Sequence, residues 1–254
     1  MHKENCFITL TYNPENLPEH GTLVLKHFQD FMKRFRKKHG SGIRFYHCGE
    51  YGGKGKRPHY HACIFGFRFK DLIFFKEENG NKIYISEDLE KLWGKGFVTV
   101  GDVTFDSAAY VARYITKKIT GELQEYNYGT KVNTTTGEIT LLRKPEYNTM
   151  SRRPGIGKTW FDKFGSDVYP SDTLIIKGKH LKPPKYYDAL YEHLDPKEFQ
   201  KLRYRRIKES AKLKKLNPEE FESERLAVKE KIQNNNVLNK LPRKYENEEK
   251  ILHN

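Results

Sequence analysis

The chain has 254 residues, 36% of them hydrophobic, which is enough for at least one folded domain with its own core. Its formal net charge of +14 favours a polyanionic partner such as nucleic acid. No apolar stretch reaches the roughly 18 residues that a membrane-spanning helix needs, so a membrane is the weaker alternative. The N-terminus MHKENCFITLTY lacks a charged segment followed by an apolar one. We therefore expect no secretory signal and a cytoplasmic location.

Four strands and three helices are predicted in the first 120 residues. Short runs rich in β-branched and aromatic residues indicate strands, and apolar residues that recur every three or four positions indicate helices. The second and third strands should form a hairpin across a glycine-rich link. The predicted strands are 6–12, 43–50, 59–67 and 97–105, and the predicted helices are 23–39, 87–93 and 108–119, the last with Asp106 or Ser107 as N-cap.

This order of elements predicts an α+β fold in which helices pack on an antiparallel β-sheet. The Thr/Gly-rich segment 126–145 is typical of a polar hairpin or a loop. From residue 196 onward Lys, Glu and Leu dominate, which indicates helices. We expect a first domain at residues 1–170 and a basic, largely helical C-terminal extension at 171–254. Cys6, Cys48 and Cys63 fall in predicted strands without CxxC spacing, so buried thiols are expected.

His59 and His61 are separated by one residue in a predicted strand, so both imidazoles point to one face. Two such imidazoles can hold a metal ion, although a chain with ten histidines can also pair them by chance. Glu50 ends the strand expected to pair with the histidine strand, and the hairpin can bring its carboxylate to the imidazoles. The alternative is a solvated carboxylate at a strand end. Two histidines and a carboxylate suit Mg²⁺ or Mn²⁺, and they also suit Zn²⁺ or Fe²⁺.

Tyr110 and Tyr114 lie four positions apart in the last predicted helix, with Lys117 and Lys118 one turn beyond. A phenol is a poor nucleophile at neutral pH unless a cation or a base assists it, and a nearby lysine meets that need. The alternative is that the tyrosines serve only packing. On a helical wheel the tyrosines are expected away from the apolar stripe, which consists of Ala108, Val111, Ala112, Ile115 and Ile119.

Together the histidine and tyrosine motifs fit one reaction. A metal ion held by the histidines and the glutamate would polarise a phosphodiester oxygen, while a tyrosine attacks phosphorus and displaces the 3′-hydroxyl. The product is a 5′-phosphotyrosine bond, which conserves the energy of the cut backbone. A free 3′-hydroxyl can then rejoin strands without ATP, and a second tyrosine permits a second cut while the first is occupied.

These motifs resemble HUH endonucleases, and among them the rolling-circle replication initiators of the microviruses, especially the gokushovirus type. The resemblance rests on FITLTY, on GEYG followed by RPHYHACIFGF, and on YVARYITKK, with MSRRPGIGKTWFDKF as a further segment. It implies an HUH, or Rep-like, fold and Mg²⁺ or Mn²⁺ as cofactor. By this resemblance His59 and His61 are metal ligands with Glu50 as the third, Tyr110 and Tyr114 are nucleophiles, and Lys117 assists them.

The resemblance also implies a metal-dependent DNA endonuclease and strand transferase of a bacteriophage. It would nick the plus-strand origin of the replicative form and stay joined to the 5′ phosphate. Host helicase and polymerase would unwind and copy the DNA in the cytoplasm of the host bacterium. The basic run 201–216, with eight Lys/Arg against one Glu, is either a DNA-binding helix or a solvated face. The basic residues predicted to contact DNA are Arg57, Arg113, Lys118, Arg152, Arg153 and Lys158.

Three alternatives stay open at this point. A plasmid initiator, relaxase or transposase of the HUH class would use the same chemistry on another DNA sequence. A non-catalytic single-stranded DNA-binding protein would use basic and aromatic residues but would not need the tyrosine pair. A cupin-like Fe²⁺ oxygenase would need a further acidic or histidine ligand shortly after His61, where the sequence ACIFGF offers none.

Overall fold

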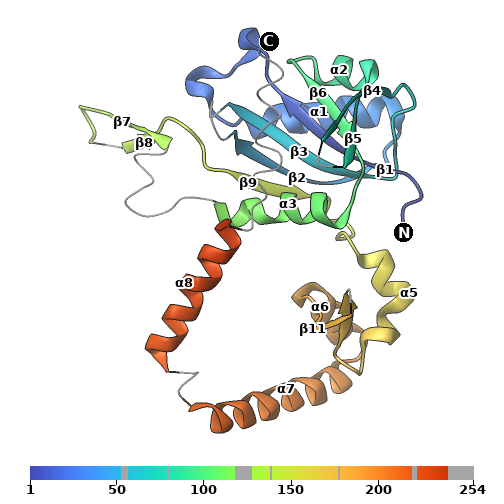
Figure 1. Cartoon of the computed structure of the whole chain (residues 1–254), viewed down its shortest axis with the longest axis vertical. Helices are drawn as coiled ribbons and strands as arrows, with labels where there is room; N and C mark the ends of the chain where they lie inside the picture. Colours follow the sequence, from blue (N-terminus) through green and yellow to red (C-terminus); the bar gives the residue numbers. More distant parts are fainter. Residues whose placement is uncertain are drawn as a thin grey trace. The chain divides into compact units, whose positions relative to one another are not determined.

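The computed structural model describes residues 1–52, 57–78, 80–117, 128–137, 139–176, 178–218 and 222–239 (Figure 1). Contacts divide the chain into two compact units. His2–Ser151 make up the sheet unit, and Arg152–Asn235 make up the helical unit. The fold is α+β with a large antiparallel sheet and helices at the C-terminal end, as the sequence predicts.

A seven-stranded antiparallel sheet forms the centre of the sheet unit. Its strand order is β4-β5-β6-β1-β3-β2-β9. The histidine strand β3 therefore lies between β1 and the glutamate strand β2. The strands are β1 (Asn5–Thr11), β2 (Arg44–Tyr51), β3 (Pro58–Phe65), β4 (Ile73–Glu78), β5 (Asn81–Ile85), β6 (Val98–Gly101) and β9 (Tyr147–Met150).

One face of the sheet carries the main core. Alternate strand residues such as Ile8, Leu10 and Tyr60 point to this face, where α1 (Leu25–His39) and α2 (Glu87–Trp93) cover them. The buried side of α1 is the apolar stripe that its sequence predicts, and it consists of Phe28, Phe31, Met32 and Phe35. The helix ends at Gly40, whose φ of 108° lies outside the range that most side chains adopt.

The opposite face of the sheet is covered by α3 (Phe105–Lys117), which contacts β2, β3 and β9. Figure 1 shows α3 running along these strands on the side away from α1. A smaller apolar cluster forms here, because the intervening strand residues point to this face. Its members are Phe7, Cys48, Cys63, Tyr110 and Val111.

The expected strands and helices of the sheet unit are present, with ends shifted by a few residues. The predicted strand 97–105 is shorter, because it ends at Gly101 and α3 already begins at Phe105. Thr104, and not Asp106 or Ser107, therefore caps α3. The Ser107 N–H donates to Thr104 Oγ1 at 3.1 Å, and the Thr104 N–H donates to Ser107 Oγ at 2.8 Å. This reciprocal pair satisfies two backbone donors at the helix start, as in a capping box.

The sequence did not predict β4 and β5 as strands, because charged residues interrupt their apolar pattern. They form a hairpin whose turn contains Gly80 with a φ of 76°, a conformation that glycine adopts without strain. The polar segment 126–145 contains a second hairpin, β7 (Thr130–Val132) with β8 (Ile139–Leu141). The hairpin interpretation of that segment is therefore confirmed.

The helical unit has its own small core, made by α5, α6 and α7 around Phe161, Tyr169, Phe199 and Leu202. Its α5 lies before residue 170 yet packs within this unit. The division into domains 1–170 and 171–254 stays a prediction, because contacts alone do not test which segments fold independently. The elements are α5 (Lys158–Val168), β10 (Leu174–Ile176), β11 (Lys179–Leu181), α6 (Lys185–Leu194) and α7 (Pro196–Leu216), and α8 (Ser223–Asn239) follows them.

Candidate active site

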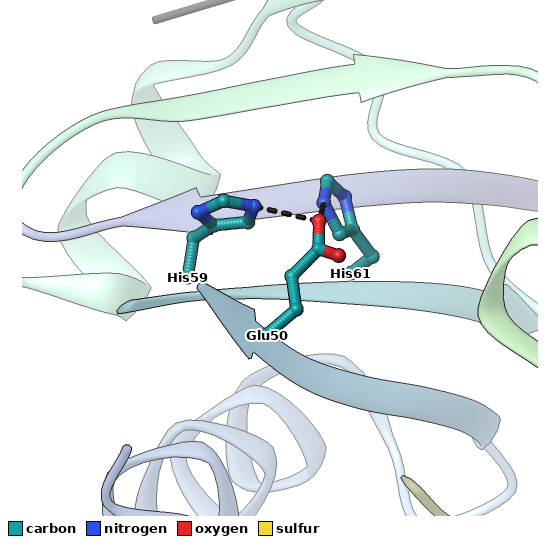
Figure 2. Close-up of side chains that lie close together, drawn as sticks. All are labelled: Glu50, His59 and His61. Carbon is teal, nitrogen blue, oxygen red and sulfur yellow. Dashed lines mark hydrogen bonds and ion pairs between the residues drawn. The ribbon is translucent and has the colours of Figure 1, made fainter. Parts of the chain in front are cut away.

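The register of β2 and β3 brings Glu50, His59 and His61 together. Glu50 pairs directly with His59, and His61 lies two positions further along β3 on the same face. One ligand atom from each of the three side chains lies within 4.8 Å of the other two (Figure 2). All three residues are buried. The two histidines and the glutamate that the sequence singled out therefore form one cluster on the α3 side of the sheet.

One carboxylate oxygen is the centre of this cluster. Glu50 Oε1 lies 2.7 Å from His59 Nε2 and 2.7 Å from His61 Nε2. Tyr110 of α3 donates its hydroxyl hydrogen to the same oxygen at 2.8 Å. Glu50 Oε2 is buried and has no hydrogen-bond partner in the part of the chain that the structure describes. An orphaned buried acceptor costs about 1–3 kcal/mol, a cost that a bound cation removes.

The charge of Glu50 follows from its surroundings. Burial alone would raise the pKa of this carboxyl, because the charged form loses its hydration. The facing imidazoles of His59 and His61, and their hydrogen bonds, outweigh burial and hold the pKa of Glu50 well below its usual range. The residue is therefore an anion, which can bind a cation or accept hydrogen bonds.

The backbone determines which nitrogen of His59 carries a proton. His59 Nδ1 lies 3.1 Å from the carbonyl oxygen of Arg57, which can only accept, so Nδ1 donates. In a neutral imidazole Nε2 then directs a lone pair at Glu50 Oε1, which also carries lone pairs. A cation between these two atoms, either a proton or a metal ion, removes the repulsion. Metal-binding histidines commonly donate their second nitrogen to a carbonyl in this way, so the donor set fits a divalent metal ion.

The ring of His61 is held by residues of β1, the strand on the other side of β3. Thr9 Oγ1 lies 3.0 Å from His61 Nδ1, and the ring of Phe7 stacks on the imidazole at 5.6 Å. Neither residue was singled out from the sequence. The alternation of FITLT does place Phe7 and Thr9 on one strand face, but only the pairing of β1 with β3 identifies that face as the histidine face.

Tyr110 lies on the buried side of α3, so the prediction that the tyrosines lie away from the core is wrong for this residue. It is 4% exposed, and its ring meets the edge of the His61 ring at 5.1 Å. Ala112, which the wheel placed in the apolar stripe, is exposed. The wheel treated the phenol as polar, whereas a tyrosine ring is readily buried when its hydroxyl has a partner, here Glu50.

The remaining residues of the tyrosine motif are described only in part. Tyr114 and Lys117 follow Tyr110 by about one and two turns of the α3 backbone. The side chains of residues 113–117 lie outside the described part, as does the whole of Lys118. The roles of Arg113, Tyr114, Lys117 and Lys118 therefore stay predictions.

The other predicted DNA contacts lie in two places. Arg57 precedes β3 and donates to the Tyr12 carbonyl oxygen at 3.1 Å, so part of its guanidinium serves the fold. Arg152 and Arg153 are exposed at the start of the helical unit. Lys158 begins α5 and forms an ion pair with Asp162. Contact of these residues with DNA stays a prediction.

The cysteines do not compete with Tyr110 as nucleophiles. Cys6, Cys48 and Cys63 are buried free thiols, as predicted. Burial raises the pKa of Cys6 and of Cys63 to about 12, because a thiolate is poorly solvated there. In the described residues, no helix combines the length and the apolar character that crossing a membrane requires.

Comparisons with known proteins agree with this geometry. The family model for replication-associated proteins of the ORF2 type matches residues 5–119, which span β1 to α3 and include the whole cluster. Replication-associated protein ORF2 of Spiroplasma virus 4 is 34% identical over 213 residues, or 78% of this chain and 61% of that protein. Replication-associated protein VP4 of Bdellovibrio phage phiMH2K is 33% identical over 210 residues, with the same shares of the two chains.

A third relative, Replication-associated protein ORF4 of Chlamydia phage 1, is 28% identical over 202 residues, or 76% of this chain and 47% of that protein. The chain thus spans less than two thirds of the length of each of these relatives. No solved structure matches the chain significantly. The matches confirm the resemblance to microvirus-type rolling-circle replication initiators, and the chain belongs to the family of phage replication-associated proteins that the ORF2-type model describes.

Proposed function

We propose that this chain initiates rolling-circle DNA replication by nicking one DNA strand with a tyrosine nucleophile. The observation that carries the proposal is the 2.8 Å hydrogen bond from the Tyr110 hydroxyl to Glu50 Oε1. It joins residues 60 positions apart and brings the tyrosine helix onto the histidine cluster. A metal-binding strand protein without this chemistry would not need a phenol at the shared carboxylate.

In the proposed reaction the Tyr110 oxygen attacks a phosphodiester phosphorus. A bond forms between the tyrosine oxygen and phosphorus, the bond from phosphorus to the 3′-oxygen breaks, and the tyrosine proton ends on the released 3′-hydroxyl. Glu50 accepts the hydrogen bond of the attacking hydroxyl and so orients it. Bound to Glu50, His59 and His61, a divalent metal ion would supply Lewis-acid stabilisation of charge on the phosphate.

The chemistry conserves a phosphodiester bond throughout. The 5′-phosphotyrosine product can be attacked by a free 3′-hydroxyl, which rejoins the strand and releases Tyr110 without ATP. Tyr114, one turn later on α3, would make a second cut while Tyr110 carries DNA, and Lys117 would assist at the phosphate. These roles rest on the sequence motif YVARYITKK, since the side chains of Tyr114 and Lys117 are not described.

The family places this activity in a phage-infected bacterium. We propose the plus-strand origin of the replicative form as the substrate, Mg²⁺ or Mn²⁺ as the cofactor, and host helicase and polymerase as partners in the host cytoplasm. A plasmid initiator, relaxase or transposase would use the same cluster, but the relatives named above are phage proteins. A purely DNA-binding role would leave the contact between Tyr110 and Glu50 without a purpose.

The proposal is tested by looking for a covalent protein–DNA adduct. The full chain is incubated with Mn²⁺ and with overlapping single-stranded oligonucleotides that tile the genome encoding it, and adducts that survive SDS are counted. We expect the wild type and Tyr204→Phe, which alters a 69% exposed tyrosine, to form the adduct with the same oligonucleotide. Tyr110→Phe/Tyr114→Phe should form none, although it keeps both rings. An equal adduct in the double variant, or none in the wild type on any oligonucleotide, refutes the proposal.

A further inference from the structure

The helix α7 has two dissimilar halves. Its first half packs in the helical unit, where Phe199 and Leu202 are buried beside α6. From Ile207 to the end of the helix every residue is exposed. Figure 1 shows the first turns of α7 close to α6 and the remaining turns extending away from it. A helical half of this length is marginal alone in water, so a partner that binds it would also stabilise it.

The basic residues of α7 fall on one side of the helix. At 100° per residue, six of them occupy an arc of about 80°. The two acidic residues, Glu198 and Glu209, lie outside this arc, and the buried Phe199 lies nearly opposite to it. We call this set the basic stripe, and its members are Lys197, Lys201, Arg205, Lys208, Lys212 and Lys215.

The charges of the stripe are balanced only near its start. Lys201 pairs with Glu198 at 2.6 Å, and Arg205 donates to the Pro170 carbonyl oxygen at 2.6 Å. Lys208, Lys212 and Lys215 have no acidic group within 4.0 Å among the described residues. Like charges three and four positions apart destabilise a helix by about 0.2–0.5 kcal/mol per pair, and a polyanion removes that cost.

We propose that the basic stripe of α7 binds the phosphate backbone of double-stranded DNA. The inference rests on the proposed function, because it assigns a second contact surface for the same DNA. From Lys197 to Lys215 the stripe is about 27 Å long, and successive phosphates of one DNA strand are about 3.4 Å apart along the duplex axis, so several are within reach. The contacts carry charge but no base-reading geometry, so this surface holds duplex DNA without regard to sequence.

Two other anionic partners fit the stripe less well. A membrane-surface helix needs its apolar residues gathered on one side, whereas the exposed Tyr204 and Ile207 lie on the other side of α7 from Leu213 and Leu216. A groove for single-stranded DNA combines charge with several aromatic rings, and Tyr204 is the one exposed aromatic residue of α7. Duplex DNA needs only the regular row of cations.

The test compares two double variants of the full chain that remove equal charge from the same helix. Lys208→Gln/Lys212→Gln alters the stripe, whereas Arg203→Gln/Lys214→Gln alters exposed basic residues on the far side of α7. Fluorescence anisotropy measures binding to a duplex of about 30 base pairs, longer than the stripe, at several NaCl concentrations. Each lost phosphate contact lowers the slope of log K against log salt by about 0.9.

We expect the stripe variant to lower that slope by nearly 2 and to weaken binding about tenfold, and the far-side variant to change it by less than half as much. Equal slopes in the two variants overturn the proposal. So does a stripe variant that loses binding to phosphatidylserine vesicles while its slope for duplex DNA stays at the wild-type value. Adduct formation by the wild-type chain is measured separately, so the proposed nicking and the stripe can fail independently.

Discussion

The cluster in the sheet unit and the basic stripe of α7 use charge in opposite ways. Glu50, His59 and His61 are buried and meet at one oxygen, so the loss of one group leaves the others unpaired. Lys208 and Lys212 are exposed and separate, so their effects should simply add. A buried cluster positions a single reacting bond, whereas an exposed stripe adjusts the affinity for an extended partner.

The largest effect should come from removing the shared carboxylate. Glu50→Gln replaces the anion by a neutral amide that keeps one oxygen, and both imidazoles and the Tyr110 hydroxyl lose their charged acceptor. We expect the rate of adduct formation to fall about a thousandfold, equal to about 4 kcal/mol of transition-state stabilisation. Single-turnover assays measure the rate, and calorimetric titration measures Mn²⁺ binding. Glu77→Gln, on an exposed glutamate of β4, is the control. A wild-type rate in Glu50→Gln would separate the cluster from catalysis.

The next effect concerns the backbone beside the cluster. Gly96 has a φ of 135°, and a Cβ there would lie 2.2 Å from the Asn13 nitrogen. Asn13 and Thr11 hold the end of β1 through hydrogen bonds to residues 95 and 97, and Thr11 pairs with His59. We expect Gly96→Ala to lower the free energy of unfolding by at least about 3 kcal/mol.

Urea denaturation followed by circular dichroism measures that loss. Gly42→Ala is the matched control, because no atom lies within 4 Å of its added Cβ and its φ is not positive. The control should stay within about 0.5 kcal/mol of wild type. Equal stability of the two variants would contradict the close approach of Gly96 to β1.

A smaller, pH-dependent effect tests the other buried imidazole. His47 stacks on Phe28 at 3.5 Å in the main core, and burial lowers its pKa to about 3. Because the unfolded chain binds its proton near pH 6.5, the stability that neutral His47 contributes is complete above that pH. It is lost as the pH falls from about 6.5 toward 3, by up to about 1.4 kcal/mol per pH unit.

Stability is measured against pH for wild type, His47→Gln and His180→Gln, which alters an exposed histidine. We expect His47→Gln to lose part of the acid sensitivity between pH 6.5 and 4.5, and His180→Gln to keep it. If all three curves run parallel, His47 does not titrate as its burial implies.

The smallest effect belongs to the exposed stripe. Lys208→Gln removes one phosphate contact and no packing, so we expect duplex binding to weaken about threefold and the free energy of unfolding to change by less than about 0.5 kcal/mol. Anisotropy and urea denaturation measure the two quantities. A loss of stability as large as that of Gly96→Ala would show that this half of α7 is packed and not exposed.

The sequence predicted the parts of the cluster that depend on strand alternation. A hairpin with a short link places Glu50 opposite His59, and the HxH spacing then adds His61 to the same face. The α1 stripe was predictable for the same reason, since Phe28, Phe31 and Phe35 follow the helical period.

The sequence could not predict what depends on distant pairing. The burial of Tyr110 was missed, because the partner of its hydroxyl is 60 residues away. The Arg57 carbonyl that orients His59 has no side-chain signature at all. The hairpin of β4 and β5 was missed, because its charged residues obscure the alternation that indicates a strand.

The most direct test of the central claim is to identify the residue that carries the DNA. The adduct formed with Mn²⁺ and the cleaved oligonucleotide is digested with nuclease and protease, and mass spectrometry locates the remaining nucleotide. We predict a 5′-linked nucleotide on Tyr110 or Tyr114 in the wild type, and on Tyr114 alone in Tyr110→Phe. A nucleotide on a residue outside α3, or a 3′ linkage, would contradict the account.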